Sequence, residues 1–407
     1  PMPQDPQALA KAQSIWLNTS INPLLERARQ PRAPSSAAAA SRAAMGTPLY
    51  VGKALPDGEV GHLLGCGNPI LDISAMVDKD MLDKYELENG AVILAEERHM
   101  PVYAELQEKY EVEYIAGGAT QNTIRVAAWM LSGRKKRPEC AYVGCVGNDE
   151  YGRKLAATCA AGGVHTNYQI DEETPTGTCA VLISRADGER TLVANLAAAN
   201  NYRREHLFHD RTVEMIRGAG IVYAAGFFLT SGGVECIEHL GEHVHAAATA
   251  GNPKRFCMNL SAPFICEFFT DQLDAAMPYV DVLFGNETEC MALGRAKRLG
   301  DDIALVALAI AAMPKKSGAR GRVVVITQGA DPTLVVENGV LHRYAVSPLA
   351  KQSIVDLNGA GDAFVGGFLS QLLLGKGVAD AVHAGHWAGR VIIQRSGCSV
   401  PERCDFA

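Results

Sequence analysis

The sequence predicts an α/β fold, a mostly parallel central sheet with helices on both faces. Short apolar runs of strand length recur along the chain and alternate with longer segments of helical periodicity. Such alternation joins parallel strands through helical crossovers, so both faces of the sheet become covered. Two stretches of short alternating runs interrupt this rhythm, which indicates a small β-rich addition to the main layer.

The strands and helices of the main layer can be placed from their composition. The expected strands occupy residues 63–67, 141–146, 221–225, 255–260, 280–284 and 323–327. Apolar stretches at 303–312 and 363–374 are expected to be helices. Ligands of such sheets bind at the carboxyl ends of the strands, so functional residues are sought there.

The two interruptions lie at about 71–115 and 175–200. They contain short alternating runs such as 178–183 and 190–194, the second after the turn 186–189. We expect antiparallel hairpins that form a lid over the site. The expected organisation is a low-complexity, disordered extension at 1–60 followed by one domain at 61–407. The extension's Arg-, Ser- and Ala-rich, acid-poor composition also suits an organelle transit peptide.

Bulk composition narrows the class of protein. The chain has 407 residues, of which 48% are apolar and 20% charged, with a formal net charge of −7. This charge argues against a nucleic-acid binder, which needs a concentrated basic face. Eleven cysteines with no Cys-x-x-Cys pair suit buried side chains in a reducing compartment. Because no apolar run is long enough to span a membrane, we expect a cytoplasmic protein with small-molecule partners.

A glycine-rich turn at 356–362 opens an apolar helix and carries the clearest chemical signal. Its glycines let successive backbone N–H groups converge, and the helix N-terminus adds positive charge, so a phosphate fits there. Asp362 would face this anion, where a carboxylate can take a proton from a hydroxyl that attacks phosphorus. The turn therefore predicts phosphoryl transfer, although the same residue types also cap ordinary helices.

Two other segments suit a sugar. Asn68 and Asp72 follow the first strand in a tight turn and can hydrogen-bond vicinal hydroxyls. The turn is not a dinucleotide fingerprint, because Ile70 stands where the third glycine belongs. Gly117 and Gly118 permit close approach of a ligand to the backbone, shortly before Asn122. A capped turn and close packing explain these segments equally well when each is read alone.

Residues at two further strand ends suit a nucleotide. Asn286 and Glu289 lie on one face if a helix begins there, and Glu289 could organise Mg²⁺ through water. A helix cap is the simpler interpretation of this pair. Thr327 and Gly329 end another strand, where they could contact nucleotide phosphates.

Two other mechanisms find little support. The segment 239–243 matches a His-x-x-Glu-His zinc-peptidase pattern, but Gly241 weakens the required helix and a solvated helix face explains the residues. The chain also lacks a Gly-x-x-x-x-Gly-Lys-Ser/Thr segment, which excludes a P-loop enzyme.

Taken together, these segments resemble the ribokinase-like (PfkB) family of sugar and nucleoside kinases. The similarity covers nearly all of the chain from Leu64 onward. It rests on ordered matches at residues 65–78, 114–122, 175–179, 194–200, 225–230, 259–264, 283–289 and 358–371. The resemblance implies a ribokinase-like three-layer α/β/α fold with a lid. It also implies ATP and Mg²⁺ as cofactors and adenosine as acceptor, phosphorylated at the 5′-hydroxyl to give AMP in purine salvage.

The resemblance also implies roles for residues. Asp362 matches the catalytic base, Arg190 a lid arginine that approaches the phosphates, and Gly359, Ala360 and Gly361 an anion hole. The implied substrate contacts are Asn68, Asp72, Gly117, Gly118, Asn122, Phe228, Phe264 and Asn358, the two phenylalanines walling the adenine. The implied nucleotide and magnesium contacts are Asn286, Glu289, Thr327, Gly329 and Gly361.

The chain departs from the family pattern at two places. Leu357 stands in place of a common threonine, and Val92 in place of a glutamine. The second change leaves recognition of the adenine edge open. A kinase for inosine, guanosine or ribose, and a non-catalytic nucleoside-binding protein, remain alternatives. We expect a monomer that binds neither nucleic acid nor membrane.

Overall fold

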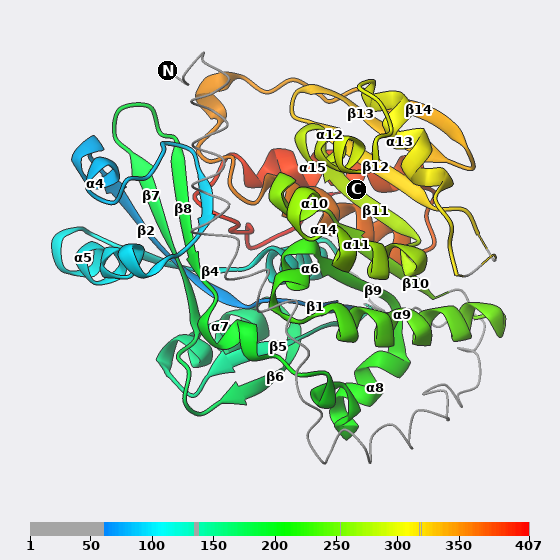
Figure 1. The fold of residues 1–407 in the computed structure, drawn as a ribbon, viewed down its shortest axis with the longest axis horizontal. Helices are drawn as coiled ribbons and strands as arrows, with labels where there is room; N and C mark the ends of the chain where they lie inside the picture. Colours follow the sequence, from blue (N-terminus) through cyan, green and yellow to red (C-terminus); the bar gives the residue numbers. More distant parts are fainter. Residues whose placement is uncertain (1–60, 134–137, 253, 317, 319, 407) are drawn as a thin grey trace.

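A computed structural model describes residues 61–133, 138–252, 254–316, 318 and 320–406. The expected N-terminal extension, 1–60, lies outside the described residues. Figure 1 shows the body of the molecule with a smaller β-rich part at one side. None of the helices in the described ranges is long and apolar enough to cross a membrane.

The body is built on a nine-stranded sheet of order β14-β13-β12-β11-β10-β9-β1-β5-β6. The neighbours from β12 through β11, β10, β9, β1 and β5 to β6 pair in parallel. Only the β12–β13 and β13–β14 pairs, at one edge, are antiparallel. The predicted α/β fold is therefore confirmed, and all six predicted strands are present. The strands are β1 (His62–Cys66), β5 (Cys140–Gly147), β6 (Val164–Asp171), β9 (Ala219–Ala225), β10 (Arg255–Asn259), β11 (Val282–Asn286), β12 (Val323–Gln328), β13 (Asp331–Glu337) and β14 (Val340–Tyr344).

Helices cover both faces of this sheet, as the apolar strands require. Successive strand side chains point to opposite faces, so Leu64 joins one apolar core and its neighbour Leu63 the other. The Leu63 face is covered by α6 (Ala119–Met130), α14 (Ala360–Leu373) and α15 (Val378–Ile392). The Leu64 face, nearer the viewer in Figure 1, is covered by α8 (Asp210–Gly218), α9 (Val234–Thr249), α10 (Pro263–Phe268), α11 (Thr270–Ala276), α12 (Glu287–Lys297) and α13 (Ile303–Ala312).

One further helix and several 3₁₀ turns complete the fold. Helix α7 (Glu150–Ala161) packs against β6 and the β-rich part. The short 3₁₀ turns are η2 (Glu97–His99), η3 (Ala197–Asn201), η4 (Arg204–Phe208), η5 (Gly226–Ser231), η6 (Met277–Tyr279) and η7 (Lys351–Ser353). All eleven cysteines are free thiols, and all but Cys404 are buried, as their scattered positions predict.

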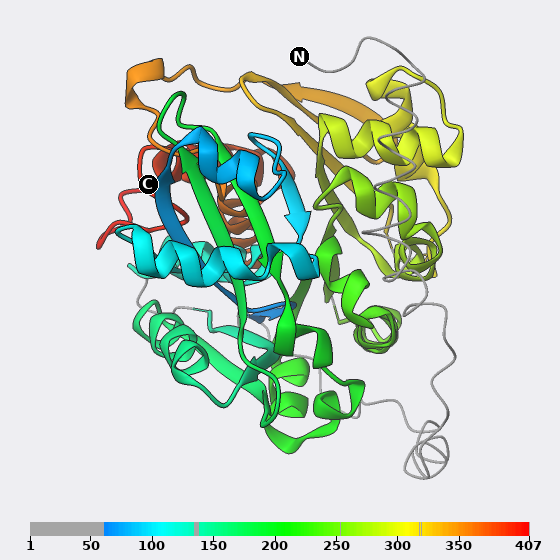
Figure 2. The ribbon, with the colours of Figure 1, turned by 60° about the vertical axis from the view of Figure 1, so that its left-hand side comes forward.

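The β-rich part is a second sheet, called the lid sheet below, of order β3-β8-β7-β2-β4. It stands beside the main sheet and comes forward in Figure 2. Its strands are β2 (Ile70–Val77), β3 (Val92–Leu94), β4 (Glu113–Gly117), β7 (Gly177–Ser184) and β8 (Arg190–Asn195). Helices α4 (Lys79–Lys84) and α5 (Pro101–Lys109) contribute to an apolar core on one of its faces.

The pairing within the lid sheet differs in part from the prediction. Strands β7 and β8 form the expected antiparallel hairpin, but β2 pairs with β7, and β3 with β8, in parallel. The reason is topological: β2 follows β1 and β7 follows β6, so both leave the main sheet in the same direction. The region 71–115 also contains two helices, which its short alternating runs did not reveal.

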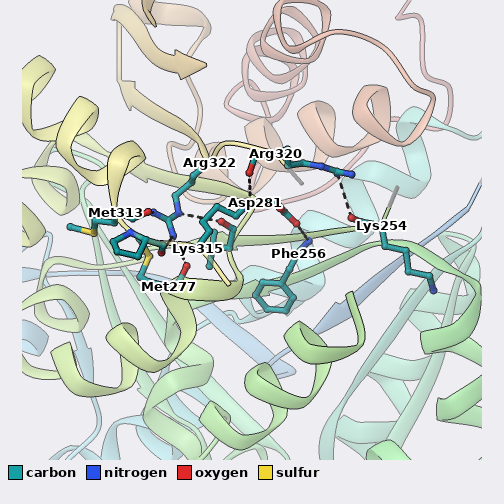
Figure 3. Close-up of polar contacts among 10 residues, drawn as sticks. Lys254, Phe256, Met277, Asp281, Met313, Lys315, Arg320 and Arg322 are labelled. Carbon is teal, nitrogen blue, oxygen red and sulfur yellow. Dashed lines mark hydrogen bonds and ion pairs between the residues drawn. The ribbon is translucent and has the colours of Figure 1, made fainter. Parts of the chain in front are cut away.

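A cluster of buried charges holds the amino ends of β10, β11 and β12 (Figure 3). Asp281 accepts hydrogen bonds from the Phe256 amide at 2.9 Å and from Lys315 Nζ at 2.5 Å. The guanidinium of Arg322 donates to five main-chain carbonyls, those of Met277, Val280, Ile310, Met313 and Pro314. These bonds close the end of α13 and satisfy the buried cation. The cluster lies at the amino ends of the strands, the edge opposite to the one where ligands of such sheets bind.

Candidate active site

A cavity of about 410 Å³ lies at the carboxyl ends of the central strands, between the main sheet and the lid sheet. The sequence-predicted residues that line it are Asn68, Asp72, Gly118, Asn122, Phe228, Phe264, Asn286, Glu289, Asn358, Gly359, Ala360, Gly361 and Asp362. Segments more than 290 positions apart in the chain therefore meet around one space.

The turn at residues 358–361, called the glycine turn below, opens α14 as predicted. Gly359 is the N-cap with φ 77°, a left-handed conformation, and a Cβ there would come 2.8 Å from Cys398 Cβ. Within the described chain, no acceptor bonds the amides of Gly359, Gly361 or Asp362. These N–H groups lie at the N-terminus of α14, the positive end of the helix dipole. Free amides at a helix N-terminus are an arrangement that binds anions.

Asp362 lies in the first turn of α14, beside these amides. Asn122 Nδ2 donates a hydrogen bond of 3.1 Å to its Oδ2. Burial raises the pKa of Asp362 from 3.8 to about 7, the Asn122 hydrogen bond opposes this rise, and the Glu289 charge adds to it. A carboxyl group with a pKa near neutrality is suited to act as a general base.

Asp72 projects from β2 into the same cavity. Burial raises its pKa to about 7, the charge of Asp362 adds to the rise, and Arg125 opposes it. Gly117 does not line the cavity but makes room for this carboxylate, since a Cβ there would lie 2.4 Å from Asp72 Oδ1. The structure thus gives this predicted glycine a supporting position on β4.

Asn68 is fixed by protein contacts on both ends of its amide. Its Nδ2 donates to the Phe227 carbonyl at 3.2 Å, and its Oδ1 accepts from Ser231 Oγ at 3.1 Å. Gly118 has φ 91°, and a Cβ added there would lie 2.4 Å from the main-chain oxygen of Asn68. The backbone therefore leaves no room for a side chain at this position. The second hydrogen of Asn68 Nδ2 remains available to a ligand.

Asn286 and Glu289 form the predicted helix start. Asn286 is the N-cap of α12, and its Oδ1 accepts from the Glu289 amide at 2.8 Å. Both oxygens of Glu289 accept hydrogen bonds from Asn286, one from its amide at 3.0 Å and one from Nδ2 at 2.9 Å. Burial raises the pKa of Glu289 to about 7. The helix cap is therefore present, and the same two side chains also face the cavity.

Besides Gly117, three predicted residues do not line the cavity. Thr327 pairs with Asn286 across β11 and β12, and Gly329 follows in the turn to β13 with φ 58°. Arg190 lies at the start of β8, where its Nε makes an ion pair with the buried carboxylate of Asp356. Its side chain thus contacts the segment before the glycine turn.

The apolar walls of the cavity include residues that the sequence analysis did not assign. Phe228 is only 1% exposed and packs into the core, whereas its neighbour Phe227 faces Phe264 with ring centroids 6.2 Å apart. The lid sheet adds an apolar wall of Val92, Ile93, Leu94, Leu192 and Ala194. Residues 192 and 194 lie on the same face of β8. The alternation of residues along this strand could therefore have indicated that both side chains line the site.

Asn259 and Ser261 line the cavity and were also not assigned. The Ser261 amide donates to Asn259 Oδ1 at 2.9 Å, and Ser261 adopts φ 72°. A non-glycine residue in this region is strained, and such strain occurs often at functional sites. Composition gives no signal for it, because the strain depends on the fold around the residue.

The zinc-peptidase pattern on α9 makes no metal site. Glu242 pairs with Lys316 instead, and His243 Nε2 lies 3.2 Å from the buried Lys254 Nζ. The described residues contain no group of three or more His, Cys, Asp or Glu that could hold a metal ion.

Comparison with known proteins agrees with this geometry. The profile of the pfkB family carbohydrate kinases matches residues 80–403. The chain belongs to this family. It is 50% identical to adenosine kinase 1 of Arabidopsis thaliana over 347 residues, 85% of this chain and 98% of that protein. It is 44% identical to the adenosine kinase of Dictyostelium discoideum, covering 83% of this chain and 96% of that protein.

Solved structures of adenosine kinases are similar over most of the chain. Anopheles gambiae adenosine kinase in complex with P1,P4-di(adenosine-5) tetraphosphate superposes with a TM-score of 0.75 and 47% identity, covering 84% of this chain and 97% of that one. The Schistosoma mansoni adenosine kinase in complex with adenosine and AMP gives a TM-score of 0.77 and 35% identity, covering 86% of this chain and 100% of that one. The ribokinase-like fold predicted from the motifs is thus confirmed.

Proposed function

We propose that this pfkB kinase is an adenosine kinase, which transfers the γ-phosphoryl group of ATP to the 5′-hydroxyl of adenosine and forms AMP and ADP. The main observation behind this proposal is the position of Asp362. Its carboxylate lies beside main-chain amides that have no acceptor among the described residues, in a cavity with apolar walls. The four similar proteins described above are adenosine kinases by name, which supports the choice of acceptor.

The chemistry follows from the residues around the glycine turn. Asp362 accepts the proton of the attacking hydroxyl, which its raised pKa favours near neutral pH. The amides of Gly359 and Gly361 stabilise the negative charge that builds on the transferred phosphoryl group. Asn122 fixes the carboxylate of Asp362, so that base and anion-binding amides stay aligned.

The nucleoside is proposed to bind with its sugar toward the polar end of the cavity. Asp72 and the free hydrogen of Asn68 Nδ2 bond the ribose hydroxyls. The adenine lies between Phe264 and the apolar wall of the lid sheet, where a flat ring gains from stacking and from exclusion of water. Val92 supplies an apolar contact and no hydrogen bond to the adenine edge.

The residues of α12 fit a magnesium ion held through water. Both oxygens of Glu289 already accept hydrogen bonds from Asn286, so the free lone pairs suit water-mediated contact better than a closed carboxylate cage. When bound with ATP, Mg²⁺ neutralises charge on the phosphates. Thr327 and Gly329 are proposed to lie beside the nucleotide, next to Asn286 on the neighbouring strand end.

Steady-state kinetics test the proposal. We expect ADP release with adenosine to exceed release with inosine, guanosine or ribose, and to require magnesium. Replacing the base, Asp362→Asn, should lower kcat by about 100-fold or more, because general-base assistance is worth ~10² to 10⁴. Adenosine should still bind to this variant, as measured by calorimetry.

Other results would select the alternatives. Inactivity on adenosine with good activity on another acceptor would assign a related kinase of the same fold. Tight adenosine binding without any turnover would indicate a nucleoside-binding protein. Near wild-type turnover of Asp362→Asn would remove this residue from the reaction.

The remaining expectations concern the setting of the enzyme. A net charge of −7 supports small-molecule partners rather than nucleic acid. We propose that it acts as a monomer in the cytoplasm, and an organelle remains the alternative if residues 1–60 direct import.

A further inference from the structure

Asp356 is a buried carboxylate that the proposed reaction does not use. Its side chain is fully buried, and it lies two positions before the glycine turn. The Asn358 amide donates to its Oδ1 at 2.8 Å, and the Gly397 amide donates to its Oδ2 at 2.6 Å. Arg190 completes the set through the ion pair of its Nε with Oδ1. A buried charge is costly unless it is paired and hydrogen-bonded in this way.

These partners come from three separate parts of the fold. Asn358 belongs to the glycine turn, Gly397 to the C-terminal segment after α15, and Arg190 to the lid sheet. The Arg190 side chain is only 12% exposed, so the pair is shielded from solvent. Shielding strengthens such a pair relative to a surface salt bridge. A single carboxylate therefore ties the lid sheet to the turn that is proposed to receive the phosphoryl group.

Strand β8 connects this pair to the nucleoside cavity. Residues 190, 192 and 194 alternate along the strand and share one face of it. Leu192 and Ala194 line the cavity, whereas Arg190 does not and reaches Asp356 instead. The ion pair thus fixes one end of β8. The next residues on the same face of this strand, Leu192 and Ala194, form part of the apolar wall proposed to cover the base.

We propose that Asp356 is a positioning residue and that its pair with Arg190 is a latch, holding the lid sheet closed over the nucleoside and the glycine turn in place. This inference rests on the proposed function, because it assigns the latched cavity to adenosine. It differs from the role that the family resemblance implies, in which Arg190 approaches the phosphates. In a latch the arginine acts on nucleoside binding even when no ATP is present.

Two measurements on the full chain without ATP test the latch. Hydrogen exchange of β8 in the unliganded protein reports how firmly the lid sheet is held. Calorimetry reports adenosine affinity. We expect Arg190→Met and Asp356→Asn each to speed exchange in residues 190–195 and to weaken adenosine binding by about tenfold. The double variant should be no worse than the more affected single variant, because both changes break one pair.

Arg185→Met is the matched control. This arginine lies at the tip of the same hairpin and pairs with the exposed Asp78, so its loss should change neither exchange in β8 nor adenosine affinity. Arg190→Lys keeps the charge and should recover part of the affinity that Arg190→Met loses. If Asp356→Asn does not fold, Arg190→Met and its lysine rescue still decide the matter.

Several outcomes would overturn the latch. One is unchanged exchange and adenosine affinity in Arg190→Met together with a raised KM for ATP, which would assign the arginine to the phosphates. Additive effects in the double variant would separate the two residues. Failure of the wild-type chain to bind adenosine would instead contradict the proposed function, while exchange in the unliganded protein would still test the pair.

Discussion

Gly359 and Gly361 lie two positions apart in the glycine turn, yet their surroundings differ. Gly359 needs a left-handed φ of 77°, and an added Cβ would meet Cys398 at 2.8 Å. At Gly361 no atom of the described residues, apart from its chain neighbours and the backbone of its own helix, lies within 4 Å of an added Cβ, and its φ is not in the left-handed region. The space beside Gly361 is therefore open in the protein and belongs, on our proposal, to the transferred phosphoryl group.

This difference gives a paired prediction. Gly361→Ala should keep or slightly raise Tm, since alanine favours helices over glycine by roughly 0.5–1 kcal/mol. Its kcat/KM should fall by about tenfold or more, because a methyl group occupies the anion site and displaces the phosphoryl group. Gly359→Ala should instead lower Tm by several degrees. Full activity of a stable Gly361→Ala protein would place the phosphoryl group elsewhere.

The sequence predicted those site residues that belong to short, contiguous patterns. Asp362, Asn286 and Glu289 belong to short patterns with a direct chemical meaning, and all three line the cavity. Arg190 and Gly117 show the limit of such patterns. Their contacts with Asp356 and Asp72 join segments far apart in the chain, and spacing alone cannot reveal which distant residue a side chain meets.

The elements of the main sheet were predictable because each carries its own periodicity. The helix expected at 303–312 is α13 with the same bounds, since Asp302 caps its start and accepts hydrogen bonds from the amides of Ala304 and Leu305. Pairing in the lid sheet was not predictable in the same way. Short strands such as β3, with three residues, owe their partners to the topology and not to their own sequence.

The pairing of strands β2 and β4 in the lid sheet places Asp72 in the proposed nucleoside site. They pair antiparallel with Ile70 opposite Gly117, and the Asp72 carboxylate lies against that glycine. Gly117→Ala should push this carboxylate from its place and weaken adenosine binding by about tenfold, as Asp72→Ala would by leaving ribose hydroxyls unpaired. Calorimetry measures both. Gly133→Ala, where an added Cβ meets no atom of the described residues within 4 Å, is the matched control.

The result would be informative in either direction. If Gly117→Ala binds adenosine as tightly as the wild-type protein, Asp72 does not contact the ribose from its present position. If the variant binds weakly and Gly133→Ala does not, the close approach of β4 to Asp72 is part of the nucleoside site.

For the whole molecule, burial creates two opposed sets of titrating groups. The pKa is raised by burial to about 7 in three cavity carboxyl groups, those of Asp72, Glu289 and Asp362. The pKa is lowered by burial to about 4 in three histidines of the α8 and α9 side, His206, His239 and His243. Folding thus disfavours the charged form of all six groups.

The two sets act on stability in opposite directions as the pH falls. A carboxyl group with a raised pKa in the folded state stabilises below its unfolded value near 4, and this stability is lost as the pH rises toward 7. A histidine with a lowered pKa destabilises as the pH falls from about 6.5 toward 4. Between pH 7 and 4 the wild-type protein therefore gains stability from one set and loses it through the other, so the effects of the two sets on Tm oppose each other.

Replacing one of the cavity carboxyl groups shows how much stability the folded protein loses by keeping that group ionised. At pH 8 burial disfavours the ionised form of Asp362, so Asp362→Asn should raise Tm, by roughly 1–2 °C for each kcal/mol in a chain of this size. At pH 4 the wild-type carboxyl is protonated and the difference should vanish. Asp331→Asn, at an exposed position of β13, controls for the loss of one negative charge. Calorimetric Tm values from pH 4 to 8 decide, and an equal loss of stability by Asp362→Asn at every pH would show that this carboxylate is held for packing and not for proton transfer.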